Sequence, residues 1–79
     1  MIWWKPIPGH HGYEVSQTGI VRSWRRQGAA TDLAQKPRYM QITRKQYVVL
    51  RDDTCKPQPM HLRKVLQLSG WLDDPRYPG

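Results

Sequence analysis

The cationic side chains of this 79-residue chain are concentrated between residues 22 and 51. This segment holds eight basic residues and one acid, Asp32, whereas the rest of the chain holds five of each sign, so the segment alone accounts for the net charge of +7. Guanidinium and ammonium groups bind phosphates and displace counterions from a nucleic-acid backbone. A neutral scaffold with one basic segment is therefore typical of a protein that binds a polyanion. The eight residues are Arg22, Arg25, Arg26, Lys36, Arg38, Arg44, Lys45 and Arg51.

Three histidines, one cysteine and the pair Asp52-Asp53 are the other groups that could bind a metal or act in catalysis. Zinc sites use cysteine and histidine ligands at characteristic spacings, and the single Cys55 and the adjacent His10 and His11 match none of them. One cysteine also excludes an internal disulfide, which favours a reducing compartment. We therefore predict no metal and no cofactor, and we expect His61 to make a structural hydrogen bond.

The elements that must position the basic residues are short. Apolar and polar residues alternate on both sides of a turn at Gly19, which predicts a β-hairpin over residues 13–24. Two further strands are predicted at 38–42 and 46–51, around a turn. Residues 25–35 are predicted to form a loop that can include one helical turn.

Helical spacing begins at Met60 or His61, and Gly70 is a natural C-cap from which Trp71 folds back onto the helix. The predicted fold is α+β: a small antiparallel sheet of about four strands, built from β-hairpins, with one C-terminal helix packed on it. Residues 1–72 are expected to form a single domain, and residues 73–79 a solvated tail. The predicted core residues are Trp4, Tyr13, Val15, Val21, Trp24, Tyr47, Leu50, His61, Val65, Leu66 and Trp71.

The N-terminal part of the chain matches a known pattern. The matching residues are Trp4-Lys5-Pro6-Ile7-Pro8-Gly9 and Gly12-Tyr13-Glu14-Val15-Ser16-Gln17-Thr18-Gly19-Ile20-Val21-Arg22-Ser23. They resemble the nuclease-associated modular DNA-binding motif of the NUMOD type, fourth class, which lies at the front of HNH homing endonucleases of phages and group I introns. Gln17 replaces the usual Asn. The resemblance continues more weakly through Lys36-Pro37, residues 47–50 and a helix start at residues 60–66.

The resemblance implies a DNA-binding module without its nuclease. In the family, an HNH motif that holds one divalent metal follows the helix, but here Asp73-Asp74 is followed by Pro75 and the sequence contains no Asn. We therefore expect a non-catalytic protein of phage or prophage origin, whose narrow antiparallel ribbon contacts the phosphate backbone and the major groove. The expected nucleic-acid-binding residues are Gln17, Thr18, Arg22, Arg25, Arg26, Lys36, Arg38, Gln41, Thr43, Arg44 and Lys45.

The expected partner is double-stranded DNA, and RNA offers the same backbone chemistry. A nuclease, or another phage or host protein, could act with the chain in trans. The alternative function is that of a protein-protein interaction or inhibitor protein built on the nuclease-derived fold, with an exposed apolar patch around Trp3 and Trp71. The longest apolar run is Val48-Val49-Leu50 and the N-terminus does not resemble a signal peptide, so we expect a cytoplasmic protein that does not associate with membranes. The Met1 start favours a complete small protein.

Overall fold

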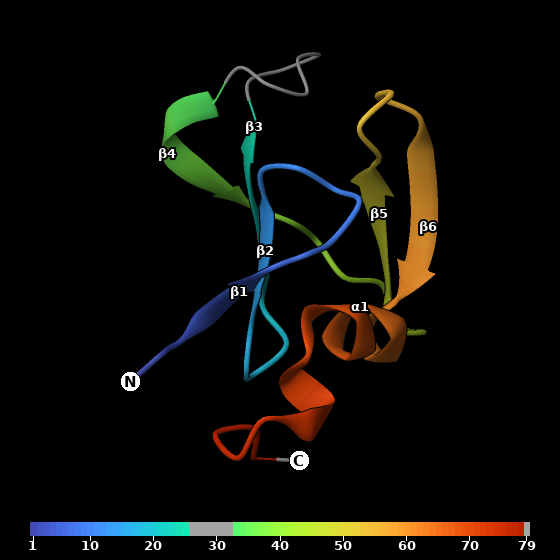
Figure 1. The fold of residues 1–79 in the computed structure, drawn as a ribbon. Coiled ribbons are helices and arrows are strands. Elements are labelled where there is room, and N and C mark those ends of the chain that lie inside the picture. The colour runs from blue at the N-terminus through green and yellow to red at the C-terminus, as the bar shows by residue number, and fades with distance from the viewer. Residues whose placement is uncertain (26–32, 79) are drawn as a thin grey trace.

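The computed structural model describes residues 1–25 and 33–78 as an α+β fold (Figure 1). In chain order the elements are β1 (Trp4–Pro6), β2 (Tyr13–Ser16), β3 (Val21–Arg25), β4 (Leu33–Tyr39), β5 (Tyr47–Arg51), β6 (Pro57–His61), α1 (Leu62–Ser69) and the short 3-10 helix η1 (Trp71–Asp73). An antiparallel four-stranded sheet has the order β1-β2-β3-β4, and β5 and β6 form a separate hairpin. The predicted fold class is confirmed.

The hairpin of β2 and β3 forms for local reasons. Gly19 has a φ of 88°, a left-handed conformation in which a side chain would be strained, and it closes the turn between the two strands. The hydroxyl of Ser16 accepts hydrogen bonds from the backbone N–H groups of Thr18 and Ile20, at 3.3 and 3.0 Å. The hairpin predicted over residues 13–24 is therefore confirmed.

The pairing of the later strands differs from the prediction. Instead of a hairpin between residues 38–42 and 46–51, β4 begins at Leu33 and pairs with β3, and β5 pairs with β6. Asp52 explains the second pairing, because one of its carboxylate oxygens accepts hydrogen bonds from the N–H groups of Thr54 and Lys56, at 2.9 and 3.0 Å. These bonds close a tight turn between β5 and β6. The predicted loop over 25–35 thus contains the start of β4, and its other part lies largely outside the described residues.

The helix α1 is bounded by two caps. His61 is the N-cap, and its Nδ1 atom accepts a hydrogen bond from the backbone N–H of Arg63 at 3.1 Å. Gly70, with a φ of 90°, is the predicted C-cap. Among the residues that the structure describes, no helix is long and apolar enough to cross a membrane.

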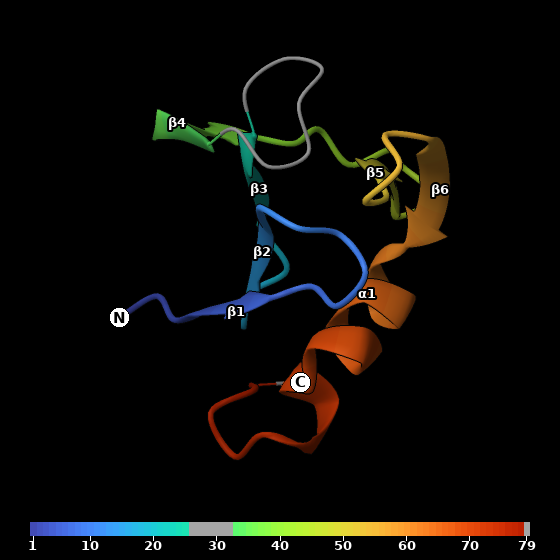
Figure 2. The same ribbon diagram turned by 45° about the horizontal axis from the view of Figure 1, so that its top comes forward.

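The core lies between the four-stranded sheet on one side and α1 with the β5–β6 hairpin on the other (Figures 1 and 2). Val65 and Leu66 are the buried residues of α1. Trp71, which follows the helix, is fully buried, and its indole N–H donates a hydrogen bond to the carbonyl oxygen of Val15 at 2.8 Å. This bond meets the only polar group of the indole, so the large ring is buried without an unpaired donor.

The C-terminal segment is anchored to the domain by Asp74 and Tyr77, which are half-buried, while the other described residues of 73–78 are exposed. The Lys5 ammonium lies 2.8 Å from the carboxylate of Asp74, and Arg76 binds the same carboxylate at 3.0 Å. Hydrogen bonds from Arg76 and then Lys5 hold the pKa of Asp74 well below its usual value. Tyr77 packs against the core. Residues 73–78 are therefore solvated over much of their length, as predicted for a tail, but two of their side chains attach them to the domain.

Candidate nucleic-acid interface

Arg22, expected to bind phosphate, is engaged inside the protein. Its Nε donates a hydrogen bond to the Glu14 carboxylate at 2.8 Å. Its guanidinium lies 3.7 Å from the ring centre of Trp4 and 5.0 Å from that of Trp24. Only 17 % of the side chain is exposed. An arginine that is paired with a carboxylate and covered by two indoles is a structural residue in this state.

Arg25, also expected to bind phosphate, connects the four-stranded sheet to the β5–β6 hairpin. Its Nε donates a hydrogen bond to the carbonyl oxygen of His11 at 2.5 Å, and its Nη1 donates to the carbonyl oxygen of Asp52 at 3.0 Å. Its Nη2 lies 3.5 Å from the Asp53 carboxylate, and the residue is 6 % exposed. Arg25 thus links the β1–β2 connection to the turn between β5 and β6, and its charge is not presented to solvent.

The tip of the first hairpin is also used internally. The Gln17 Oε1 accepts a hydrogen bond from the N–H of Trp3 at 2.8 Å, and its Nε2 donates to the carbonyl oxygen of Met1 at 2.7 Å. Gln17 is buried and fixes the N-terminal residues against the turn. Thr18 is exposed, and its hydroxyl lies 2.9 Å from that of Ser16. Both polar atoms of the Gln17 amide are therefore engaged within the protein, and this side chain does not present the expected contact to a nucleic acid.

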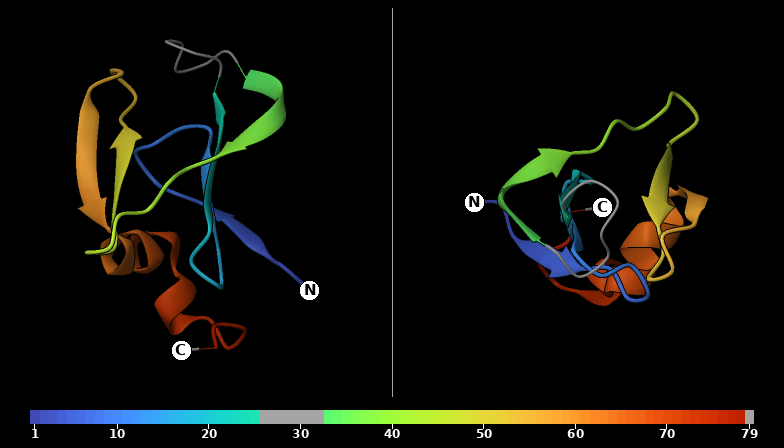
Figure 3. Two further views of the ribbon diagram at one scale, coloured as in Figure 1. Left: turned by 180° about the vertical axis from the view of Figure 1, so that it is seen from behind. Right: turned by 90° about the horizontal axis from the view of Figure 1, so that it is seen from above.

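The other predicted contact residues are exposed along one continuous stretch. From β4 the chain crosses behind the four-stranded sheet, as seen in Figure 1, to reach the start of β5 (Figure 3). The ion pairs among the described residues use Lys5, Arg22, Arg25 and Arg76, and none of the cations of this stretch. The exposed residues, which we call the basic strip, are Lys36, Arg38, Gln41, Thr43, Arg44 and Lys45. Arg26, the last predicted contact, lies outside the described residues.

The turn at the end of the basic strip is well defined. Thr43 closes it, because its N–H donates to the carbonyl oxygen of Tyr47 at 2.9 Å and its hydroxyl accepts from the N–H of Tyr47 at 3.1 Å. Gln46 completes the turn with a φ of 68°. Arg44 and Lys45, between these residues, are both exposed. The turn thus presents two adjacent cations on an ordered backbone.

Two further cations lie near this turn. The N–H of Leu62, the first residue of α1, donates a hydrogen bond to the carbonyl oxygen of Gln46 at 2.7 Å. This contact places the start of α1, which includes the exposed residues Arg63 and Lys64, beside the turn. The site list predicted from the sequence omits both residues, although their position in a first helical turn without an acidic residue already hints at a nearby phosphate.

Most of the residues predicted to form the core are buried, but four of them are half-buried or exposed. Trp4 and Trp24 are half-buried, because Arg22 covers them rather than an apolar neighbour. Tyr47 is 44 % exposed and His61 is exposed, since both lie at the open end of the β5–β6 hairpin, where their rings are 5.2 Å apart. The buried members of the predicted core are Tyr13, Val15, Val21, Leu50, Val65, Leu66 and Trp71.

The far end of the β5–β6 hairpin is built around a carboxylate. The hydroxyl of Thr54 and the backbone N–H of Lys56, in that order, contribute most to lowering the pKa of Asp52 from 3.8 to about 2. Gln58 donates to the second carboxylate oxygen at 2.8 Å. Asp52 is therefore ionised at neutral pH and serves the turn, at the opposite end of the hairpin from Arg44 and Lys45.

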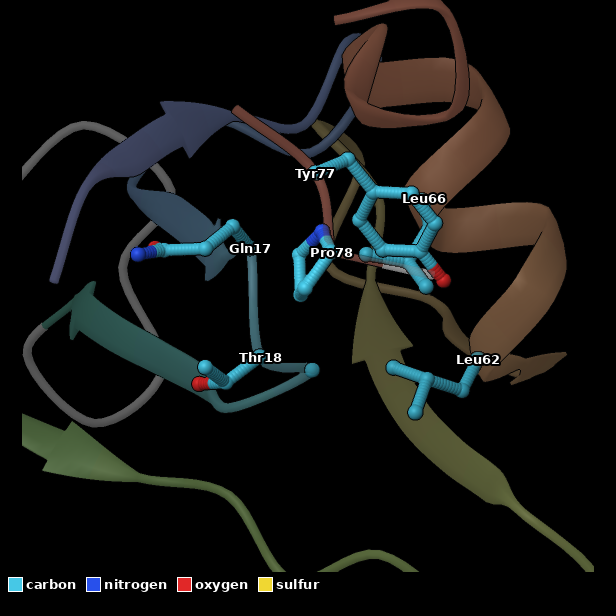
Figure 4. Close-up of a pocket in the computed structure, with 7 residues that line it drawn as sticks. Gln17, Thr18, Leu62, Leu66, Tyr77 and Pro78 are labelled. Atoms are coloured by element: carbon cyan, nitrogen blue, oxygen red, sulfur yellow. The ribbon is translucent and has the colours of Figure 1, made fainter. Parts of the chain in front are cut away.

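An apolar groove of about 340 Å³ lies between the turn that joins β2 to β3, the helix α1 and the C-terminal segment. Leu62 and Leu66 of α1 form one wall, and Tyr77 and Pro78 form another (Figure 4). Its lining includes no charged side chain from the described residues. The groove is therefore a surface of different character from the basic strip.

Within residues 1–25 and 33–78, no three His, Cys, Asp or Glu side chains are close enough together to hold a metal ion. Comparison of the chain with protein-family models, with curated proteins and with solved structures finds no match.

Proposed function

We propose that this chain is a non-catalytic DNA-binding module that holds double-stranded DNA through the basic strip. The observation that carries the proposal is the exposure of Lys36, Arg38, Arg44 and Lys45 without an acidic partner among the described residues. The sequence resemblance to the DNA-binding region of HNH homing endonucleases supports the choice of DNA. The contact surface we propose is thus narrower than the sequence predicts, because the cations of the first hairpin are engaged internally.

The four cations of the strip act on the phosphate backbone. Each phosphate contact releases condensed counterions, so the logarithm of the affinity should fall with the logarithm of salt concentration with a slope of about −3 to −4 for four contacts. Gln41 and Thr43 are exposed between them and can hydrogen-bond base edges in the major groove. The backbone term supplies affinity, and any sequence preference comes from the two polar residues.

The test compares two sets of cations on the same hairpin. Arg44→Gln with Lys45→Gln removes the charges of the turn, and Lys56→Gln removes an exposed charge at the opposite end of β5–β6. Binding to a labelled random-sequence duplex of about 25 base pairs is followed by fluorescence anisotropy at several salt concentrations. We expect the double variant to reduce the steepness of the salt dependence by about 2, and Lys56→Gln to leave it unchanged.

Within the basic strip, Arg44 and Lys45 are the better residues to replace in this test, because their charges have one expected role. Lys36, Pro37 and Arg38 lie on the edge strand β4, where charges and proline also prevent pairing with another chain. The turn residues have no such second role. Equal salt slopes for the double variant and for Lys56→Gln would contradict the proposed surface, and absence of duplex binding at low salt would contradict the proposed function.

The apolar groove favours a second function, that of a protein-interaction or inhibitor protein. The patch expected for this function around Trp3 and Trp71 does not form, because Trp71 is fully buried. The groove beside Leu62 and Tyr77 takes its place. An interaction through this apolar surface should persist at high salt, whereas binding through the basic strip should not.

A further inference from the structure

The four-stranded sheet has an outer face that no described helix or strand covers, since α1 and the β5–β6 hairpin lie together against its other face (Figures 1 and 2). The strand register places Glu14 opposite Arg22, and Arg22 opposite Tyr39. Residues that lie directly opposite one another on neighbouring strands share a face. These three side chains therefore form a row across the outer face.

Two indoles complete this face and hold the row in place. The Arg22 guanidinium lies over the rings of Trp4 and Trp24, and both Arg22 and the Trp24 indole N–H donate to the same Glu14 oxygen, at 2.8 and 2.6 Å. The positive charge of Arg22 is thus matched by Glu14 within the face. The result is a nearly neutral layer in which the Arg22 guanidinium and the Trp4 and Trp24 rings contact one another.

Tyr39 is the part of this layer that is open to solvent. It is 62 % exposed, and its ring centre lies 6.3 Å from that of Trp4. An exposed tyrosine on an edge strand contributes little to the stability of the fold, and the tilted contact with the Trp4 ring leaves much of the Tyr39 ring accessible to a ligand. The same strand carries the exposed cations Lys36 and Arg38, which have no ion-pair partner among the described residues. Arg38 lies opposite Ser23 and so leaves the strand on the other side from Tyr39, but because β4 is an edge strand, a nucleic-acid backbone that runs along this edge can reach both.

Resting on the proposed DNA-binding function, we propose that Tyr39 and the Trp4–Arg22–Trp24 layer stack an unpaired nucleobase of a DNA strand whose phosphates are held by Lys36 and Arg38. A nucleotide is the partner that matches both halves of this surface, because it joins a planar π-system to an anionic backbone. Stacking of a base on an aromatic side chain is sequence-tolerant and contributes about 1–3 kcal/mol. The chain should therefore prefer duplexes that contain unpaired bases over fully paired ones.

The experiment compares a fully paired duplex with the same duplex containing a short mismatched bubble, so that both probes carry the same number of phosphates. The expected result is an affinity for the bubble that is about 5- to 150-fold higher, the factor equivalent to one stacked base. Tyr39→Ala should remove this preference and leave binding to the paired duplex nearly unchanged. Tyr39→Phe should keep it, because the ring remains.

Two controls isolate the stacking. Tyr47→Ala removes another exposed tyrosine, on the β5–β6 hairpin, and should leave the preference intact. A bubble with abasic sites in place of its bases offers nothing to stack and should bind like the paired duplex. Equal affinity for bubble and paired duplex, or a preference that survives in Tyr39→Ala, would overturn the inference while the proposed function stands. Failure to bind either probe would remove the proposed function and the inference together.

Discussion

The first hairpin, β2–β3, and the basic strip that follows it carry similar side chains but use them in opposite ways. In the hairpin, Arg22 and Arg25 are held by carboxylates, carbonyl oxygens and aromatic rings. In the strip, Lys36, Arg38 and their neighbours are exposed and make no described ion pair. The two regions show that the number of basic residues in a segment does not equal the charge it offers to a ligand.

The difference follows from the size of the molecule. The chain contains no Phe, and its core is built around a few aliphatic side chains and one buried tryptophan. A small domain of this kind exposes a large share of its surface, so its core alone supplies limited stability. Arginines that stack on indoles and bridge separate segments add apolar contact and hydrogen bonds at once. The hairpin arginines therefore complete the fold, and the strip is left for a partner.

The largest effect is expected from Arg25→Met. This change leaves the carbonyl oxygens of His11 and Asp52 without their buried donor, and it removes the Arg25 bridge between the β1–β2 connection and the β5–β6 turn. We expect the free energy of unfolding in urea to fall by about 2–4 kcal/mol, since bonds to a charged donor are lost and buried acceptors are left unpaired. The matched change in the strip, Arg44→Met, should alter stability by less than about 0.5 kcal/mol.

If Arg25→Met and Arg44→Met have comparable free energies of unfolding, the claim that the hairpin arginines stabilise the fold and the strip cations do not would be wrong. Arg25→Lys is a useful intermediate, because a single ammonium can reach one of the two carbonyl oxygens but cannot bridge both. Its stability should fall between those of wild type and Arg25→Met.

A smaller effect is expected from Arg22→Ala. Loss of the bond to Glu14 and of the contacts with Trp4 and Trp24 should reduce the free energy of unfolding by about 1–2 kcal/mol. The affinity of the folded Arg22→Ala protein for a paired duplex should stay within about twofold of the wild-type value, because the charge removed is already matched by Glu14.

The comparison variant is Arg38→Ala. Arg38 lies on β4 opposite Ser23, the residue that follows Arg22 on β3, and its loss should weaken duplex binding while stability stays nearly unchanged. Thermal unfolding and anisotropy measured on the same preparations separate the two patterns, and a reversed result would assign the contact with paired duplex to Arg22 rather than to Arg38.

The comparison also shows which features could be predicted from the sequence. The turn at Gly19 and the helix end at Gly70 depend on local backbone conformation, so the residues themselves specify them. The pairing of β4 with β3 depends on contacts between distant segments, and Leu33–Tyr39 has neither an alternating pattern nor a turn signal that joins it to its partner. The assignment of Arg25 to the fold has the same origin, because His11 and Asp52 become its neighbours only after distant segments have packed. Glu14, in contrast, lies opposite Arg22 within the predicted hairpin, so the register of that hairpin already indicates this pair.

The smallest effect is expected from pH, through the turn to which Arg25 donates. The pKa of Asp52 is about 2 in the fold, compared with its ordinary value of 3.8, because Thr54 and Lys56 donate hydrogen bonds to the ionised carboxylate. A carboxyl group whose pKa is lowered by folding stabilises the folded state above its unfolded pKa, and this stabilisation is lost as the pH falls through the folded value. The melting temperature should therefore decline between about pH 4 and pH 2, and the decline should be shallower in Asp52→Asn. Asp74, whose pKa is also lowered, contributes to the same decline, so Asp74→Asn is measured in parallel. An unchanged pH profile in Asp52→Asn would show that the turn stabilises the β5–β6 hairpin without the carboxylate charge. The charge of Asp52 would then not contribute to the stability of the fold, unlike that of Arg25.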